Sequence, residues 1–145
     1  MFLRVLVLML LAALPVDAAP MADALDLASR ERARVGLSAL RHDPRLAAAA
    51  EVQATFMARE GRIGHVGPGG SSFGDRIRAT GYQGCYGAEN VAAGQRTSAA
   101  VTRSWMGSDG HRQNILNGRM TDGAVAAVRD RNGRLWWAMV LAGPC

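Results

Sequence analysis

The chain has 145 residues, two cysteines and a formal net charge of +5. That length is usual for one domain and is enough to bury a real core. All 17 basic residues are arginine, but no platform of interleaved basic and aromatic residues is present, which argues against a nucleic-acid partner. The positive charge would favour binding to anionic lipid head groups or acidic envelope polymers. The alternative is that the arginines are mixed with acidic residues over the surface and indicate no particular partner.

The first residues have the composition of a secretory signal. Arg4 precedes an apolar stretch over residues 5–16, and the small residues that follow suit cleavage after Ala18. The apolar run is about 12 residues, whereas a membrane-spanning helix needs roughly 20, so a retained anchor is the alternative. We expect a signal peptide over residues 1–18 and a mature domain over residues 19–145 that is secreted or periplasmic and has no stable membrane span.

The mature chain begins with two helical patterns. The first covers residues 21–35 and is stopped by Gly36. Asp43 followed by Pro44 is typical of a helix N-cap with proline in the first turn, and this second helix should run to about Arg59.

The middle of the chain alternates glycine-rich loops with short elements. We expect a loop over residues 61–72 and a short helix over residues 73–80. A loop that enters a short strand should follow over residues 82–94. A third main helix over residues 98–106 and a turn with one further helical turn over residues 107–117 complete this part.

The last part of the chain predicts a β-hairpin. Two apolar runs, residues 124–129 and 134–141, flank Asn132-Gly133, which is a strong turn signal. Helices followed by a terminal antiparallel hairpin indicate an α+β domain.

Cys85 and Cys145 form an even pair in a chain with an export signal. Such a pair predicts a disulfide, which would close a loop of about 60 residues and destabilise the unfolded chain by about 4 kcal/mol. Two free thiols are the alternative.

Five segments in order resemble the CAP superfamily (cysteine-rich secretory proteins, antigen 5 and pathogenesis-related proteins), in particular its small bacterial SCP-like extracellular branch. They are SRERARVGLSAL, DPRLAAAAEVQATFMA, GHVGPGGSSFGDRI, GYQGCYGAENVAAG and WMGSDGHRQNIL. The resemblance implies a three-layer α–β–α sandwich with a central antiparallel sheet and a cleft on one face.

The resemblance also implies the site residues. The cleft of the superfamily usually carries two histidines and two acids; His65, Glu89 and His111 match three of them. The second acid is replaced by Ser108, three residues after Trp105, as is common in the small bacterial members. The predicted binding cleft therefore consists of His65, Glu89, Ser108 and His111.

Two imidazoles and one carboxylate suit a divalent metal such as zinc and leave a position open for water. Each residue also has a structural alternative. In these alternatives His65 is a flexible loop residue, and the His111 side chain forms a hydrogen bond with the backbone. Glu89 accepts hydrogen bonds from backbone N–H groups or pairs with Arg112. His42 is expected to be a solvated loop residue.

We expect a binding module for a lipid, an envelope polymer or a protein, with a divalent metal as the one candidate cofactor. The alternative is a metal-dependent hydrolase acting on envelope peptide or polymer bonds. A catalytic triad of Ser108, His111 and Glu89 is disfavoured, because no G-x-S-x-G elbow surrounds the serine.

The three tryptophans are candidates for the core. Trp105 should be buried on its helix. Trp136 and Trp137 are adjacent on a predicted strand and point to opposite faces, so one should be buried and the other nearer the surface.

Overall fold

The structure, a computed structural model, describes residues 19–145; the predicted signal peptide lies outside the described residues. Five α-helices, one 3-10 turn and four strands make up this described part. They are α1 (Ala19–Arg34), β1 (Arg41–His42), α2 (Pro44–Glu60), η1 (Pro68–Gly70), α3 (Phe73–Ala79), β2 (Tyr86–Ala93), α4 (Ser98–Met106), α5 (Asp109–Ile115), β3 (Asp122–Arg129) and β4 (Leu135–Gly143). Among these helices, none is long and apolar enough to cross a membrane.

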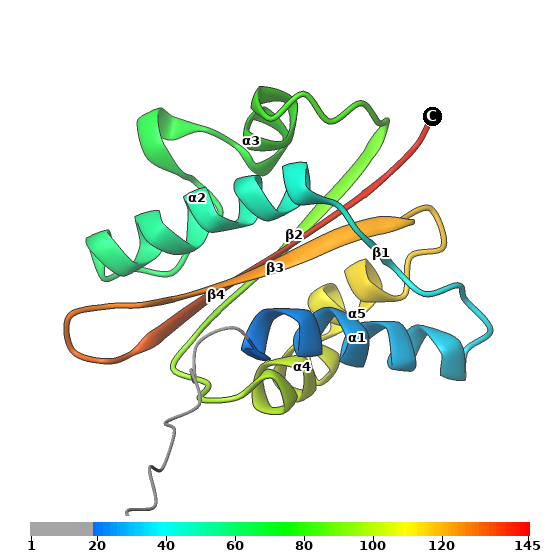
Figure 1. Cartoon of the computed structure of the whole chain (residues 1–145), viewed down its shortest axis with the longest axis horizontal. Helices are drawn as coiled ribbons and strands as arrows, with labels where there is room; N and C mark the ends of the chain where they lie inside the picture. The colour runs from blue at the N-terminus through cyan, green and yellow to red at the C-terminus, as the bar shows by residue number, and fades with distance from the viewer. Residues whose placement is uncertain (1–18) are drawn as a thin grey trace, which may run out of the picture.

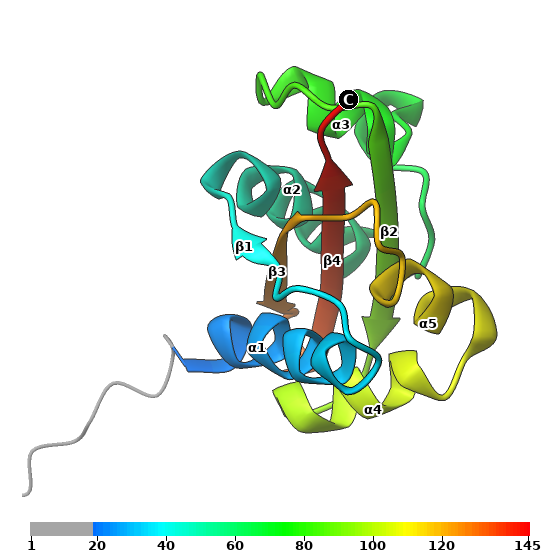
Figure 2. The same ribbon diagram turned by 90° about the vertical axis from the view of Figure 1, so that its right-hand side faces the viewer.

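The strands form one sheet in the order β1-β3-β4-β2 (Figures 1 and 2). β3, β4 and β2 are antiparallel, as expected, and the β3–β4 pair is the predicted hairpin. The two-residue β1 adds a short parallel edge beside β3. His42, expected in a loop, lies in β1 and is solvent-exposed, as expected.

Helices cover both faces of the sheet. Figure 1 shows α2 and α3 on one side and α1, α4 and α5 on the other, which confirms the three-layer α–β–α sandwich. Trp105 is buried, as predicted. The expectation that Trp136 or Trp137 would approach the surface was wrong, because both faces of β4 are covered and both side chains are buried.

The predicted disulfide between Cys85 and Cys145 is present, with the two Cα atoms 4.8 Å apart. It joins the chain just before β2 to the residue that ends the sequence after β4. A backbone hydrogen bond from Cys85 N to Gly143 O reinforces the same junction. The disulfide therefore fixes one end of the edge strand β2 to the centre of the sheet.

A buried arginine ties α1 to the segment that follows α5. Arg32 is 2% exposed, and its guanidinium donates hydrogen bonds only to backbone carbonyls. The acceptors are the carbonyl oxygens of Ser38, Ile115, Asn117 and Met120. Burial lowers the pKa of this guanidinium. The contact fixes the end of α5, and with it the helix that carries His111.

Candidate functional site

His65 lies in the loop after α2, and a buried side chain of α2 holds the backbone of this loop. α2 starts where Asp43 accepts the backbone N–H of Arg45, and it ends at Gly61, whose φ of 63° suits glycine. The inner face of the helix carries the buried Gln53, whose Nε2 donates to Gly64 O at 2.6 Å. This bond fixes the backbone immediately before His65.

The imidazole of His65 is bonded to Glu89 on β2. The distance between His65 Nδ1 and Glu89 Oε1 is 3.0 Å; the His65 side chain is 53% exposed and the Glu89 side chain is fully buried. Because an ionised carboxylate only accepts hydrogen bonds, Nδ1 carries the proton. The opposite ring nitrogen, Nε2, remains available to a ligand.

The second oxygen of Glu89 is bonded to Arg76 on α3. Arg76 Nη2 lies 2.6 Å from Glu89 Oε2, and the same nitrogen donates to His65 O at 3.1 Å. Arg76 Nη1 donates to Ser71 O at 2.8 Å. One buried guanidinium thus holds both the carboxylate that contacts His65 and the backbone of the His65 loop.

The prediction that Glu89 pairs with Arg112 was wrong. Arg112 pairs with Asp109 on its own helix, at 2.6 Å. Successive side chains on a strand face opposite sides of the sheet. Glu89 faces the layer of α2 and α3, whereas Arg112 belongs to α5 in the other layer.

The neighbouring residue on β2, Asn90, faces α5. Its Nδ2 donates to His111 O at 3.1 Å, and Asn114 Nδ2 donates to Asn90 Oδ1 at 2.8 Å. Adjacent residues of the edge strand therefore anchor the two histidine segments, one from each helical layer. Figure 2 shows β2 at the margin of the sheet with α5 beside it.

His111 and His65 are close enough to interact electrostatically. The pKa of His111 is lowered, first by burial and then by the charge of His65. Near neutral pH the His111 imidazole is therefore uncharged and able to accept a hydrogen bond or bind a cation. In the described part of the chain its ring has no hydrogen-bond partner, so the alternative in which the His111 side chain bonds backbone was wrong. The bond seen here runs from the Asn90 side chain to the carbonyl oxygen of His111.

Ser108 is the N-cap residue of α5 and is half-buried, but its side chain makes no capping hydrogen bond. Within residues 19–145 no hydrogen bond joins Ser108 to His111, and both oxygens of Glu89 are taken by His65 and Arg76. The geometry of a serine triad is therefore not assembled here. Ser108 remains a polar residue three positions before His111, at the start of the helix that carries the histidine.

The donor set fits a metal only in part. Over residues 19–145 no group of three or more His, Cys, Asp or Glu side chains is arranged to hold a metal ion. Glu89 has both oxygens engaged and a guanidinium 2.6 Å away, which disfavours a cation beside it. His65 and His111 still fit as imidazole ligands, because metal-binding histidines commonly donate their other ring N–H to a carboxylate. Metal binding by His65, Glu89 and His111 stays a prediction.

A sequence model of the Cysteine-rich secretory protein family, CAP, matches residues 25–141. The chain belongs to this family. The uncharacterized protein YkwD of Bacillus subtilis is 33% identical over 111 residues, which are 77% of this chain and 42% of YkwD. The chain thus spans about two fifths of the length of this relative.

Solved structures show the same CAP fold. An extracellular protein containing an SCP domain from Bacillus anthracis is 25% identical, with a TM-score of 0.78 over 85% of this chain and 40% of that one. An outer surface protein of Borrelia burgdorferi has a TM-score of 0.76 and 16% identity, over 83% of this chain and 90% of that one. The second likeness concerns the fold alone.

Three CAP-domain residues that organise the site, Arg76, Gln53 and Asn90, were missed by sequence reasoning. Arg76 and Asn90 lie within segments that resemble the family, but no linear pattern distinguishes them from solvated polar residues. Gly67 carries a further signal: a Cβ there would lie 2.5 Å from Arg76 Nη1 and 2.7 Å from Gln53 Oε1. The glycine leaves space for the two buried side chains.

Proposed function

We propose that this chain is an exported CAP-domain protein that binds a cell-envelope polymer on the surface formed by His65, Ser108 and His111. The observation that carries the proposal is an imidazole, 53% exposed, bonded to a fully buried carboxylate. Burying Glu89 and Arg76 is costly, and replacing such a pair by apolar residues is often neutral or stabilising. A role in presenting His65 to a ligand gives a reason for the buried pair.

The loop around His65 also offers apolar contact area. Ile63 and Val66 lie on either side of His65 and are 51% and 65% exposed. Exposed apolar side chains beside fixed polar groups are typical of binding surfaces. We assign binding rather than hydrolysis to this surface for two reasons. Ser108 lacks a bonded base, and among residues 19–145 no group of three His, Cys, Asp or Glu side chains is arranged to hold a catalytic metal ion.

Two further parts of the proposal concern export and metal. Export is supported by the signal-like composition of residues 1–18, by the disulfide, and by the extracellular relative from Bacillus anthracis. A zinc ion would be held by His65 and His111, with Glu89 orienting His65, and would supply a Lewis-acidic centre for oxygen atoms of the polymer.

The test is co-sedimentation of the exported protein with purified peptidoglycan sacculi. We expect the wild type to pellet with the sacculi and the His65→Ala/His111→Ala variant to lose at least about tenfold in affinity, as expected when a bonded polar group is removed from a binding site. His42→Ala is the matched control, because His42 is an exposed histidine in β1.

Three outcomes would contradict parts of this proposal. Equal pelleting of the double variant, with an unchanged unfolding midpoint, rules out the histidine surface. Soluble fragments released by the wild type but not by the variant assign hydrolysis instead of binding. Elemental analysis of both proteins tests the metal separately, since zinc retained by the double variant excludes His65 and His111 as its ligands.

A further inference from the structure

A polar cavity lies away from the histidine surface, between the β3–β4 turn and the chain that follows β2. Its volume is about 540 Å³, and the residues that line it are Gly94, Arg96, Arg129, Asn132, Gly133, Arg134 and Leu135. No carboxylate is among the lining residues. The side chains that meet in this cavity therefore offer three guanidinium groups and one amide.

The nearest acid in the sequence, Asp130, is turned away into the hairpin turn. Its Oδ2 accepts from Trp136 Nε1 at 2.9 Å, and its Oδ1 accepts the backbone N–H groups of Asn132 and Arg134 at 2.8 and 3.0 Å. These bonds, the one from Trp136 first, lower the pKa of Asp130. The carboxylate stabilises the turn. Within residues 19–145 no ion pair joins it to an arginine of the cavity, but the charge of Arg134 is a further cause of its lowered pKa.

Two of the three arginines are held in place by the protein. The Arg134 guanidinium lies 4.9 Å from the centre of the Trp136 ring. The same group lies next to Gly94, where a Cβ would be 3.7 Å from Arg134 Nε. Arg129 Nη1 donates to Gly133 O at 2.8 Å, which leaves its other N–H groups available.

Arg96 supplies the third cation. It is exposed, and within the described residues it has no hydrogen bond, ion pair or ring contact. It extends from the segment between β2 and α4, so the charges come from two separate parts of the chain. Like charges repel one another, and the single carboxylate of Asp130 offsets only part of three guanidinium charges. An anion in the cavity would relieve the remaining repulsion.

We propose that this cavity binds a phosphate group, as a phosphomonoester or phosphodiester. A planar guanidinium donates two parallel N–H bonds to a phosphate, and a tetrahedral phosphate has enough oxygens to accept from several arginines at once. Asn132, which also lines the cavity, has an amide that can add a neutral donor. The site is independent of the histidine surface and of whether that surface binds a polymer.

The experiment measures the affinity of the folded protein for inorganic phosphate by calorimetry, with chloride at equal ionic strength as the reference. We expect saturable binding of phosphate and not of chloride. Arg96→Gln and Arg134→Gln should each weaken the binding about tenfold, as expected for the loss of charge-assisted hydrogen bonds. Arg96→Gln is the cleaner variant because no described intramolecular contact is lost.

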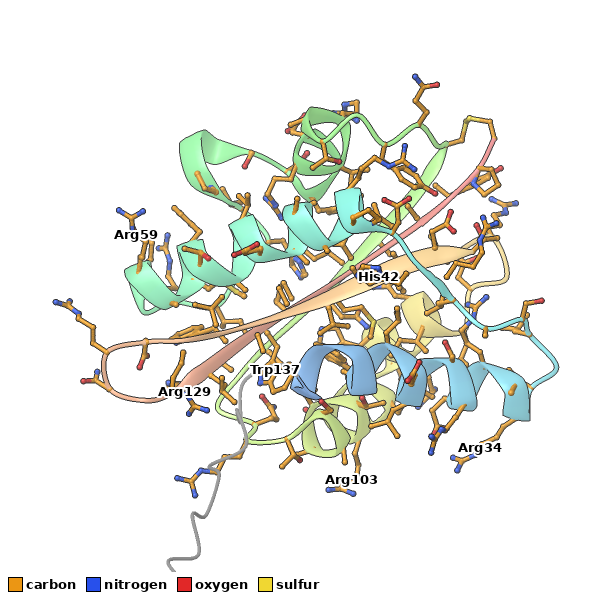
Figure 3. The ribbon with its side chains drawn as sticks, in the orientation of Figure 1. Arg34, His42, Arg59, Arg103, Arg129 and Trp137 are labelled. Carbon is orange, nitrogen blue, oxygen red and sulfur yellow. A yellow bond between two sulfur atoms is a disulfide. The ribbon has the colours of Figure 1, made fainter. Side chains whose placement is uncertain are left out.

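The matched control is Arg59→Gln. Arg59 lies at the end of α2, at the same end of the molecule as Arg129, but it does not line this cavity (Figure 3). Arg59→Gln removes the same unit of charge and should change the affinity less than twofold. Equal weakening by Arg59→Gln and Arg96→Gln, or phosphate binding no tighter than chloride, would overturn the proposal.

Vesicles separate the two sources of a phosphate group. If phosphatidylglycerol vesicles bind with the same Arg96 dependence and phosphatidylcholine vesicles do not, the group belongs to an anionic lipid. If inorganic phosphate binds and the vesicles do not, the group belongs to a soluble or polymeric phosphate ester. Either result supports a phosphate site at this cavity.

Discussion

Two buried arginines, one in each helical layer, bind different kinds of partner. Arg32 and Arg76 are 2% and 5% exposed. Arg32 donates to four backbone carbonyls and has no carboxylate partner among the described residues. Arg76 donates to a buried carboxylate, Glu89, as well as to backbone carbonyls. Arg32 joins segments of the chain, whereas Arg76 holds the carboxylate and the loop that position the exposed His65 imidazole.

The difference follows from what each charge stabilises. Neutral carbonyls compensate the desolvation of Arg32 and need no further partner, so its effect ends with the packing of α1 on the segment after α5. The charge of Arg76 is needed by Glu89, and Glu89 in turn fixes an exposed imidazole. Removing Arg32 should therefore affect stability alone, whereas removing Arg76 should also affect the His65 surface.

The largest effect is expected from Arg32→Met. The substitution leaves the carbonyls of Ile115 and Met120 buried without these donors, which should lower the free energy of unfolding by about 4 kcal/mol. Urea denaturation measures it. Arg34→Met, on the exposed side of the same helix, should cost less than about 0.5 kcal/mol. A loss below about 1 kcal/mol at Arg32 would show that the carbonyl contacts contribute little.

Arg76→Met should lower the free energy of unfolding by less than Arg32→Met does, but it should also change the order of the His65 loop. Glu89 is then buried without its charge partner, which should cost about 3 kcal/mol and release the His65 loop. The double variant Arg76→Met/Glu89→Met should be more stable than Arg76→Met, because the unpaired charge is gone. Urea denaturation gives the stabilities, and NMR of the His65 ring reports its order.

Arg78→Met is the control for this series, because Arg78 lies on the same helix and is 72% exposed. Its free energy of unfolding and the His65 signals should stay close to those of the wild type. If the double variant is less stable than Arg76→Met, the dominant loss is packing and not an unpaired carboxylate.

The smallest effect is expected from Ser72→Ala, which weakens the start of the helix that carries Arg76. Ser72 and Asp75 form a reciprocal capping box, and removing the serine hydroxyl should cost about 1 kcal/mol. The Ser72 hydroxyl is the first cause that lowers the pKa of Asp75 to about 2. Urea denaturation at several pH values measures both effects.

The pH dependence has a definite sign. A carboxyl group whose pKa is lowered in the folded protein adds stability above its ordinary value of 3.8, and the contribution is lost as the pH falls towards about 2. The advantage of wild type over Ser72→Ala should therefore shrink in that range. Thr97→Ala removes a cap from α4 without a carboxylate partner, so its deficit should stay constant; parallel curves for both variants would refute the link to Asp75.

Local signals in the sequence located most of the elements. Asp43-Pro44 marked the start of α2, Asn132-Gly133 marked the hairpin, and the two cysteines marked the disulfide. The helix start and the hairpin turn depend on residues that are adjacent in the sequence. The disulfide could be predicted because the chain has only two cysteines. The length of β2 and the existence of β1 were not predicted, because pairing with β4 and β3 defines them.

Sequence by itself determined the α+β class, because helix caps, turn residues and apolar periodicity act over a few positions. The family followed from the resemblance of five ordered segments, and with it the residue types available to the site. Tertiary structure alone decided that Glu89 and Asn90 face opposite layers, that Arg76 rather than Arg112 holds Glu89, and that Arg96 meets Arg129 and Arg134 at one cavity. The physical reason is that buried charges and polar groups must find partners in space, and nothing in linear spacing says which segment will supply them.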